Sequence, residues 1–144
     1  MKTATRSSAT AALALTALGA GASAANAAPL VAQKTYTAGG CTVRVTLDQP
    51  QAGYVQAYAD KAACAKTVPG FPKVYVSISK NGVQQISVNE TMLGKADGSY
   101  YLKNSKATPW FGADAKGTRW QACAVVTNSN GVWVAGGCTD VWVK

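Results

Sequence analysis

The sequence predicts a mainly β protein, folded as a small antiparallel β-sandwich or a small barrel and stapled by two disulfides. Two observations predict this class, and a third excludes several chemistries. Short segments of alternating apolar and polar residues recur between turn residues. Four cysteines stand in a chain of 144 residues, an even number that fits two disulfides. Histidine is absent, so no imidazole serves as a general base, a proton shuttle or a metal ligand.

The N-terminus has the layout of a secretory signal peptide. A short positive region is followed by an uncharged stretch rich in Ala and Leu, and then by small residues with cleavage options after Ala24 and Ala27. The apolar stretch is shorter than the ~20 residues that a transmembrane helix needs. We therefore expect a signal peptide over residues 1–27 and a single secreted, monomeric β domain over residues 28–144.

The charge is positive and evenly spread. Removal of the signal peptide leaves 12 basic and 6 acidic side chains. The chain contains no run of like charges of the kind that is typical of a nucleic-acid-binding arm, so nucleic acid is not an expected partner. A basic surface favours anionic partners. We expect the partner to be an extracellular protein or an anionic wall polymer.

In the first half of the mature chain, one segment clearly predicts a strand and another is compatible with either a strand or a helix. Residues 42–47 alternate strictly, with Val43, Val45 and Leu47 on one face, and predict a strand. Residues 52–66 are ambiguous, because Ala residues near helical spacing overlap a stretch that is equally compatible with a strand. One short helix is therefore left open in this segment.

Residues 73–79 and 83–88 alternate and predict a hairpin. A three-residue loop, Lys80-Asn81-Gly82, sets Val76 opposite Ile86 and brings the apolar faces together. A two-residue loop loses that match, so the longer loop is expected. A further short strand is expected over residues 99–103, before a long connection over residues 104–117 that leads to the C-terminal hairpin.

The C-terminal hairpin predicts one disulfide. Asn130-Gly131, a strong two-residue turn signal, lies between two apolar, β-prone segments. With this turn, Cys123 falls directly opposite Cys138, at a Cβ separation slightly beyond disulfide spacing. By elimination, the second disulfide joins Cys41 to Cys64.

Two features leave the pairing open. A bulge at Gly136-Gly137 would either supply the small adjustment that the Cys123–Cys138 bridge needs or slip the register. An immunoglobulin-like sandwich with an inter-sheet bridge from an early to a late cysteine is the alternative. A metal site is not expected, since the cysteine spacing contains no C-x-x-C.

No catalytic constellation is recognisable. The sequence lacks nucleophile-elbow, phosphate-loop and zinc-protease motifs, and the spacing of its six carboxylates marks no acid/base pair. We therefore expect no enzyme, no cofactor and no metal.

Two loops are candidates for protein binding. Residues 66–72 are stiffened by Pro69 and Pro72, and residues 90–95 carry two apolar side chains between strands. A substrate-like protease inhibitor needs such a rigid segment, because little entropy is then lost on binding. The candidate binding residues of these loops are Val68, Phe71, Met92 and Leu93.

The aromatic residues support a second hypothesis. Trp120 and Trp133 fall on the apolar face of the C-terminal hairpin and are expected in the core. Trp142 points to the other face, directly across from Arg119, as a cation–π pair or as a flat platform for sugar rings. The candidate platform residues are Trp142, Arg119, Tyr100 and Tyr101.

These features predict a secreted, non-enzymatic binding protein, most concretely an inhibitor of an extracellular protease that acts through a rigid loop. One alternative is a cell-wall or polysaccharide-binding module that uses exposed aromatics and the basic surface. Another is a small-ligand carrier with a pocket between the sheets.

Overall fold

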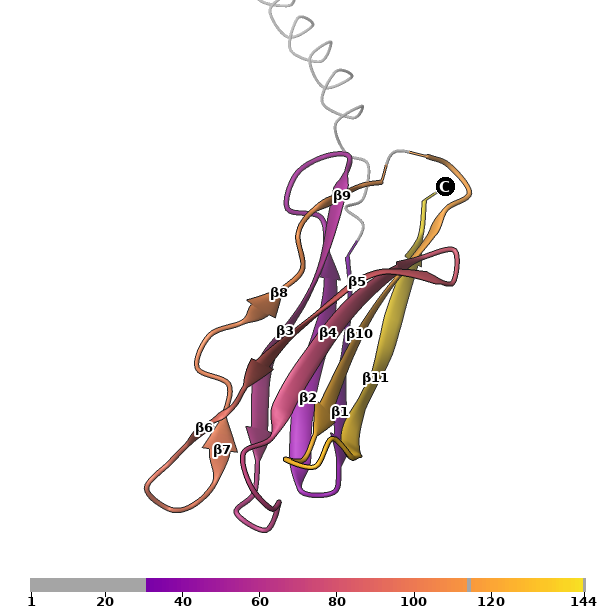
Figure 1. Cartoon of the computed structure of the whole chain (residues 1–144). Helices are drawn as coiled ribbons and strands as arrows, with labels where there is room; N and C mark the ends of the chain where they lie inside the picture. The colour runs from indigo at the N-terminus through magenta and orange to yellow at the C-terminus, as the bar shows by residue number, and fades with distance from the viewer. Residues whose placement is uncertain (1–30, 114, 144) are drawn as a thin grey trace, which may run out of the picture.

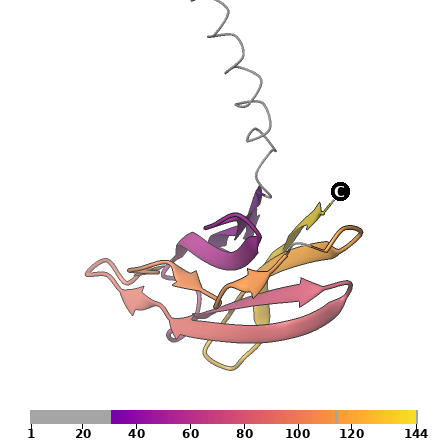
Figure 2. The same ribbon diagram turned by 90° about the horizontal axis from the view of Figure 1, so that it is seen from above.

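The computed structural model describes residues 31–113 and 115–143, so the expected signal peptide lies outside the described residues. Two antiparallel sheets pack as a sandwich (Figures 1 and 2). The larger sheet contains β1 (Ala32–Ala38), β2 (Cys41–Asp48), β3 (Tyr54–Cys64), β6 (Leu93–Gly94), β7 (Tyr100–Tyr101), β8 (Lys106–Ala107) and β9 (Phe111–Gly112). The smaller sheet contains β4 (Lys73–Lys80), β5 (Val83–Thr91), β10 (Arg119–Thr127) and β11 (Trp133–Trp142).

The predicted β-sandwich is confirmed, and the core lies between the two sheets. The inward faces expected on the β2 and β4 segments are correct, because alternate residues of these strands are fully buried. These residues are Val43, Val45, Leu47, Val74, Val76 and Ile78. Strand β1 had no counterpart among the expected strands, and the expected long connection contains β8 and β9, which both pair with β3.

The short helix left open in residues 52–66 is absent, and this segment forms β3. A β-bulge explains the misleading spacing. Thr42 pairs with Ala63 but Arg44 pairs with Asp60, so the partner strand holds an extra residue at Lys61, whose φ is 52°. The bulge returns Ala62 to the buried face that Ala59 occupies, which imitates the three-residue spacing of a helix.

Both predicted disulfides are confirmed. Cys41 is bonded to Cys64 between β2 and β3, and Cys123 to Cys138 between β10 and β11. Each bridge therefore joins neighbouring strands of one sheet, and the inter-sheet alternative is wrong. Two disulfides are typical of a chain that folds in an oxidising environment.

The register of β10 and β11 is the predicted one from Arg119 as far as Val126. The bulge is not at Gly136-Gly137, which stay in register, but at Val134, because Val126 pairs with Ala135 and Thr127 with Trp133. The extra residue interrupts the alternation, so Trp133 is 56% exposed and its predicted place in the core is wrong. Trp120 is buried as predicted.

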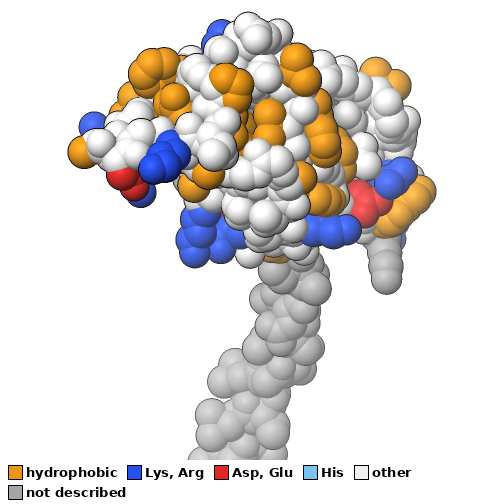
Figure 3. Space-filling model, turned by 90° about the horizontal axis from the view of Figure 1, so that it is seen from below, with side chains coloured by type: hydrophobic (Ala, Val, Ile, Leu, Met, Phe, Trp, Pro, Cys, Tyr) orange, Lys and Arg blue, Asp and Glu red, His pale blue; other side chains and the backbone are white. Residues whose placement is uncertain are grey.

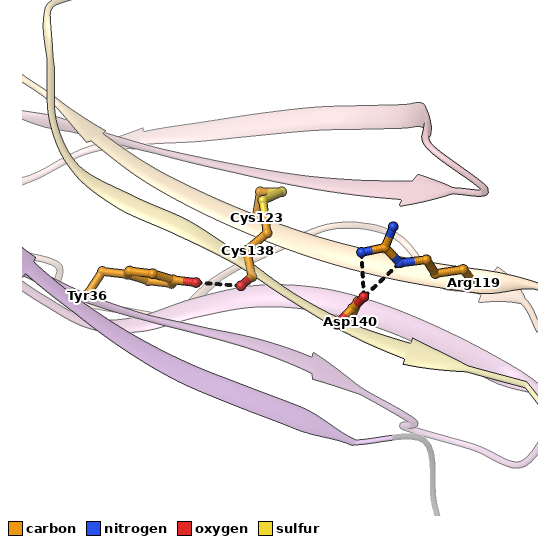
Figure 4. Close-up of a disulfide and its surroundings, with 5 residues drawn as sticks. All are labelled: Tyr36, Arg119, Cys123, Cys138 and Asp140. Atoms are coloured by element: carbon orange, nitrogen blue, oxygen red, sulfur yellow. Dashed lines mark hydrogen bonds and ion pairs between the residues drawn. A yellow bond between two sulfur atoms is a disulfide. The ribbon is translucent and has the colours of Figure 1, made fainter.

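Glycines in β11 allow a close approach between the sheets. The ring of Tyr36 on β1 lies against Gly137, and the Tyr36 hydroxyl donates a hydrogen bond to the Cys138 carbonyl over 2.5 Å (Figure 4). A side chain at Gly137 would occupy the space of the tyrosine ring. This contact fastens β1 of the larger sheet to β11 of the smaller one.

The β4–β5 hairpin differs from the expected one. Its turn has two residues, Asn81 and Gly82, both with positive φ, as in a type I′ turn. An extra residue in β5 at Gln85 then shifts the register, so that Val76 lies opposite Val88. The apolar faces match, as expected, but the match is made by a short turn and a bulge rather than by a three-residue loop.

The chain passes from one sheet to the other between β5 and β6. Met92 occupies this junction and is fully buried. Its backbone N–H donates to the Pro72 carbonyl over 2.9 Å, and its sulfur lies 3.9 Å from the Cys64 sulfur. From this junction the β6–β7 hairpin extends beyond the side of the sandwich (Figure 1).

We predict that Gly136→Ala lowers the free energy of unfolding by about 2–5 kcal/mol, because a φ of 142° adds strain and a Cβ would collide with the backbone of β10. Gly131→Ala is the matched control, since it has positive φ but open space, and should cost about 1 kcal/mol. Chemical denaturation measures both; equal losses would contradict the steric argument.

We predict an acid-sensitive contribution from Asp60. Arg44 donates two hydrogen bonds to the Asp60 carboxylate across β2 and β3, and this lowers the pKa of Asp60 below its ordinary value. The stabilisation is therefore present above the unfolded-state pKa of about 3.9 and is lost as pH falls through the lower folded-state pKa. Denaturation at pH 2–7 should show a smaller loss of stability on acidification for Asp60→Asn than for the parent protein.

Candidate functional site

Four connections meet at the lower end of the sandwich in Figure 1. They are residues 39–40, 65–72, 95–99 and 128–132, and we call them together the loop end. The Ala65 N–H donates to the Gly40 carbonyl over 2.8 Å, and the Ser129 hydroxyl donates to the Pro69 carbonyl over 3.2 Å. These contacts hold the 39–40, 65–72 and 128–132 connections against one another, directly beyond the Cys41–Cys64 disulfide.

Phe71 is the exposed large hydrophobic side chain of the 65–72 loop, with an exposed fraction of 57%. Its ring packs edge-on against Tyr100, with the centroids 5.4 Å apart, and lies over Gly94. The backbone is held on both sides of Phe71, because the carbonyls of Pro69, two residues before it, and of Pro72, directly after it, accept hydrogen bonds from other segments. An apolar ring is therefore presented to solvent from a constrained backbone.

Other exposed apolar side chains share this end of the molecule. Val132 and Trp133 are 58% and 56% exposed. Trp133, Thr127 and Lys73 are aligned across β11, β10 and β4, a span of two strand spacings or about 10 Å. Seen from below, hydrophobic side chains are scattered over this end between other groups, and charged side chains lie toward its margin (Figure 3).

The structure corrects part of the loop hypothesis. Val68 is 4% exposed and Met92 is fully buried, so both are core residues that a partner does not reach. Residues 90–95 are not a loop, because most of them continue the ladder of β5 and β6. Phe71 and Leu93 are the two candidates of this set that are exposed.

Phe71 and Leu93 do not form one surface. Leu93 pairs with Tyr101, and Gly94 pairs with Tyr100. Neighbouring residues of a strand point to opposite faces, so Leu93 and Tyr101 share one face of the hairpin while Phe71 covers the other face at Gly94 and Tyr100. The two candidate segments therefore present Phe71 and Leu93 on opposite faces of the β6–β7 hairpin.

The face with Leu93 borders a hollow of about 220 Å³. Glu90, Thr91 and Leu93 line it from the β5–β6 side. Residues 103–106, which connect β7 to β8 and include the first residue of β8, line it from the other side. Lys106 forms an ion pair with Glu90 at 3.3 Å. The expected candidates did not include these polar residues.

The proposed aromatic platform is not assembled. Trp142 is 57% exposed and lies directly opposite Arg119, as predicted, but at the end of the sandwich away from Tyr100 and Tyr101 (Figure 1). The Arg119 guanidinium binds Asp140, with Nε 2.7 Å from Oδ2, rather than the indole ring (Figure 4). The ion pair replaces the expected cation–π contact.

An aromatic pair that the sequence analysis missed lies elsewhere. Tyr54 and Trp110 are both partly exposed, and their ring centroids are 6.0 Å apart. The two residues are brought together by the pairing of β3 with β9. Because Tyr54 and Trp110 lie far apart in the sequence, the periodicity of either segment does not indicate that their rings come into contact.

Within residues 31–113 and 115–143, no three His, Cys, Asp or Glu side chains gather where they could hold a metal ion. The same part of the chain contains no helix long and apolar enough to cross a bilayer. Comparison with models of known protein families found no match, and neither did a search of curated proteins.

We predict that Met92→Ala lowers the free energy of unfolding by about 2–5 kcal/mol, because it leaves a cavity at the junction between the sheets. Its neighbour Leu93 is 44% exposed, so Leu93→Ala should cost less than about 1 kcal/mol. Urea denaturation compares the two; a larger loss for Leu93→Ala would contradict the assignment of Met92 to the core.

Proposed function

We propose that this chain is a secreted, non-enzymatic protein-binding module that acts through the loop end, most concretely an inhibitor of an extracellular protease. The observation that carries the proposal is the exposed Phe71 ring on a backbone held at Pro69 and Pro72. The signal-like N-terminal sequence and the two disulfides support secretion.

Rigidity supports binding at this end. Ordering a mobile loop at an interface costs free energy, and a loop that is already constrained avoids that cost. The 65–72 loop is held by the 39–40 turn, by Ser129 and by the junction at Met92. Exposed apolar side chains, with the charged side chains toward the margin, also resemble the usual layout of protein interfaces (Figure 3).

The geometry changes how a protease would be engaged. Gly70 has a φ of 72°, so the backbone bends immediately before Phe71 and does not continue as the fully extended segment of a substrate. We therefore propose that Phe71 enters a pocket that accepts an aromatic side chain, while Val132 and Trp133 contact the surface beside it. An aromatic anchor in a pocket is typical of interface hot spots.

The test measures how strongly the mature chain inhibits a panel of extracellular serine proteases that prefer aromatic residues. Phe71→Ala should weaken inhibition about 30-fold or more, which corresponds to the ~2 kcal/mol of a hot-spot residue. Trp142→Ala is the control, because it removes an equally exposed ring from the other end, and it should leave the inhibition constant unchanged.

Two results would overturn the proposal. If no protease of the panel is inhibited by the parent protein at micromolar concentration, the inhibitor assignment is wrong. If a protease is inhibited but Trp142→Ala weakens inhibition as much as Phe71→Ala does, the loop end is not the contact surface.

A further inference from the structure

The hollow between the β5–β6 segment and residues 103–106 has the chemistry of a small binding site. We propose that it binds an acidic saccharide, with one sugar unit that carries a carboxylate seated in the hollow. This site is independent of the protein-binding surface proposed for the loop end.

The size of the hollow sets the size of the ligand. Its volume of about 220 Å³ is smaller than the roughly 300–1,000 Å³ of pockets for drug-sized molecules. It therefore fits a single small ring with substituents rather than an extended apolar ligand. A chain of sugars would place one unit in the hollow and its neighbours along the surface.

The charges predict an anionic group on the ligand. Lys106 is paired with Glu90, whereas no acidic side chain of the described residues forms an ion pair with Lys103. Lys95 lies nearby, with its ammonium 5.4 Å from the centre of the Tyr101 ring, and adds positive charge beside Leu93. Lys103 is thus available to pair with a ligand carboxylate.

The other lining groups predict hydroxyls and a ring. The carboxylate of Glu90 accepts hydrogen bonds, so it suits a ligand that carries several hydroxyl donors. Thr91, Asn104 and Ser105 add hydroxyl and amide groups that suit a polyhydroxylated molecule. Leu93 supplies an apolar surface against which the C–H face of a sugar ring can pack.

The orientation of the hairpin keeps the two sites separate. Leu93 and Tyr101 face the hollow side, while Phe71 covers the opposite face at Gly94 and Tyr100. A ligand in the hollow therefore does not cover Phe71. A protein bound at the loop end and a saccharide in the hollow should be able to bind together.

The experiment measures binding of an oligogalacturonate to the mature protein by calorimetry at low salt, with its methyl ester and inorganic phosphate as comparison ligands. The oligogalacturonate should bind at least tenfold more tightly than either. Lys103→Gln and Lys106→Gln should each weaken its binding at least tenfold. Lys116→Gln removes an exposed charge between β9 and β10 and should have no effect.

Specific outcomes would overturn the site. Equal binding of the methyl ester would show that the carboxylate is not recognised, and equal binding of phosphate would show that the ring is not. An equal effect of Lys116→Gln would mean that general surface charge is responsible. Because Phe71→Ala should leave saccharide binding unchanged, failure of this proposal is distinguishable from failure of the protease-inhibitor proposal.

Discussion

The burial of Met92 where the chain passes from one sheet to the other is the constraint on which both candidate sites depend. Its side chain is enclosed between the sheets, and its N–H binds the Pro72 carbonyl. Pro72 directly follows Phe71, and Met92 directly precedes Leu93. Both candidate side chains are therefore held next to the same hydrogen bond. If this junction moved, the 65–72 loop and the β6–β7 hairpin would lose their common anchor.

The surroundings of this junction make it stiff. The Met92 sulfur lies 3.9 Å from the sulfur of Cys64, so the crossing packs against the Cys41–Cys64 disulfide. The same disulfide ties the two strands from which the 39–40 turn and the 65–72 loop emerge. The two candidate surfaces thus lie next to the disulfide of the larger sheet, and such a constraint would limit the entropy lost on binding.

Bulges decide which side chains reach the surface. Strict alternation correctly predicts the buried faces of β2 and β4, but it fails at Lys61, Gln85 and Val134, where one strand holds an extra residue. Each extra residue transfers the following side chains to the other face. The exposure of Trp133 is the clearest consequence. A bulge depends on how two strands fit together, so the sequence of one strand does not reveal it.

The sequence by itself determined the features that depend on neighbouring or directly paired residues. The β class follows from period-two alternation. The position of the C-terminal turn also follows from the sequence, but the expected two-residue turn at Asn130-Gly131 is wrong, because Asn128 pairs with Val132 and Asn130 has no positive φ. The longer turn shifts the register by one residue, and the bulge at Val134 restores the predicted pairing of Cys123 with Cys138. The Cys41–Cys64 bridge then follows by elimination.

The tertiary structure decided how distant segments combine. It buries Val68 and Met92, separates Phe71 from Leu93 by the two faces of one hairpin, and places Trp142 far from Tyr100. It also creates the hollow beside Leu93 from two segments that are not adjacent in sequence. These arrangements depend on the crossing between the sheets and on the bulges, which are set by packing across the whole core rather than by local sequence pattern.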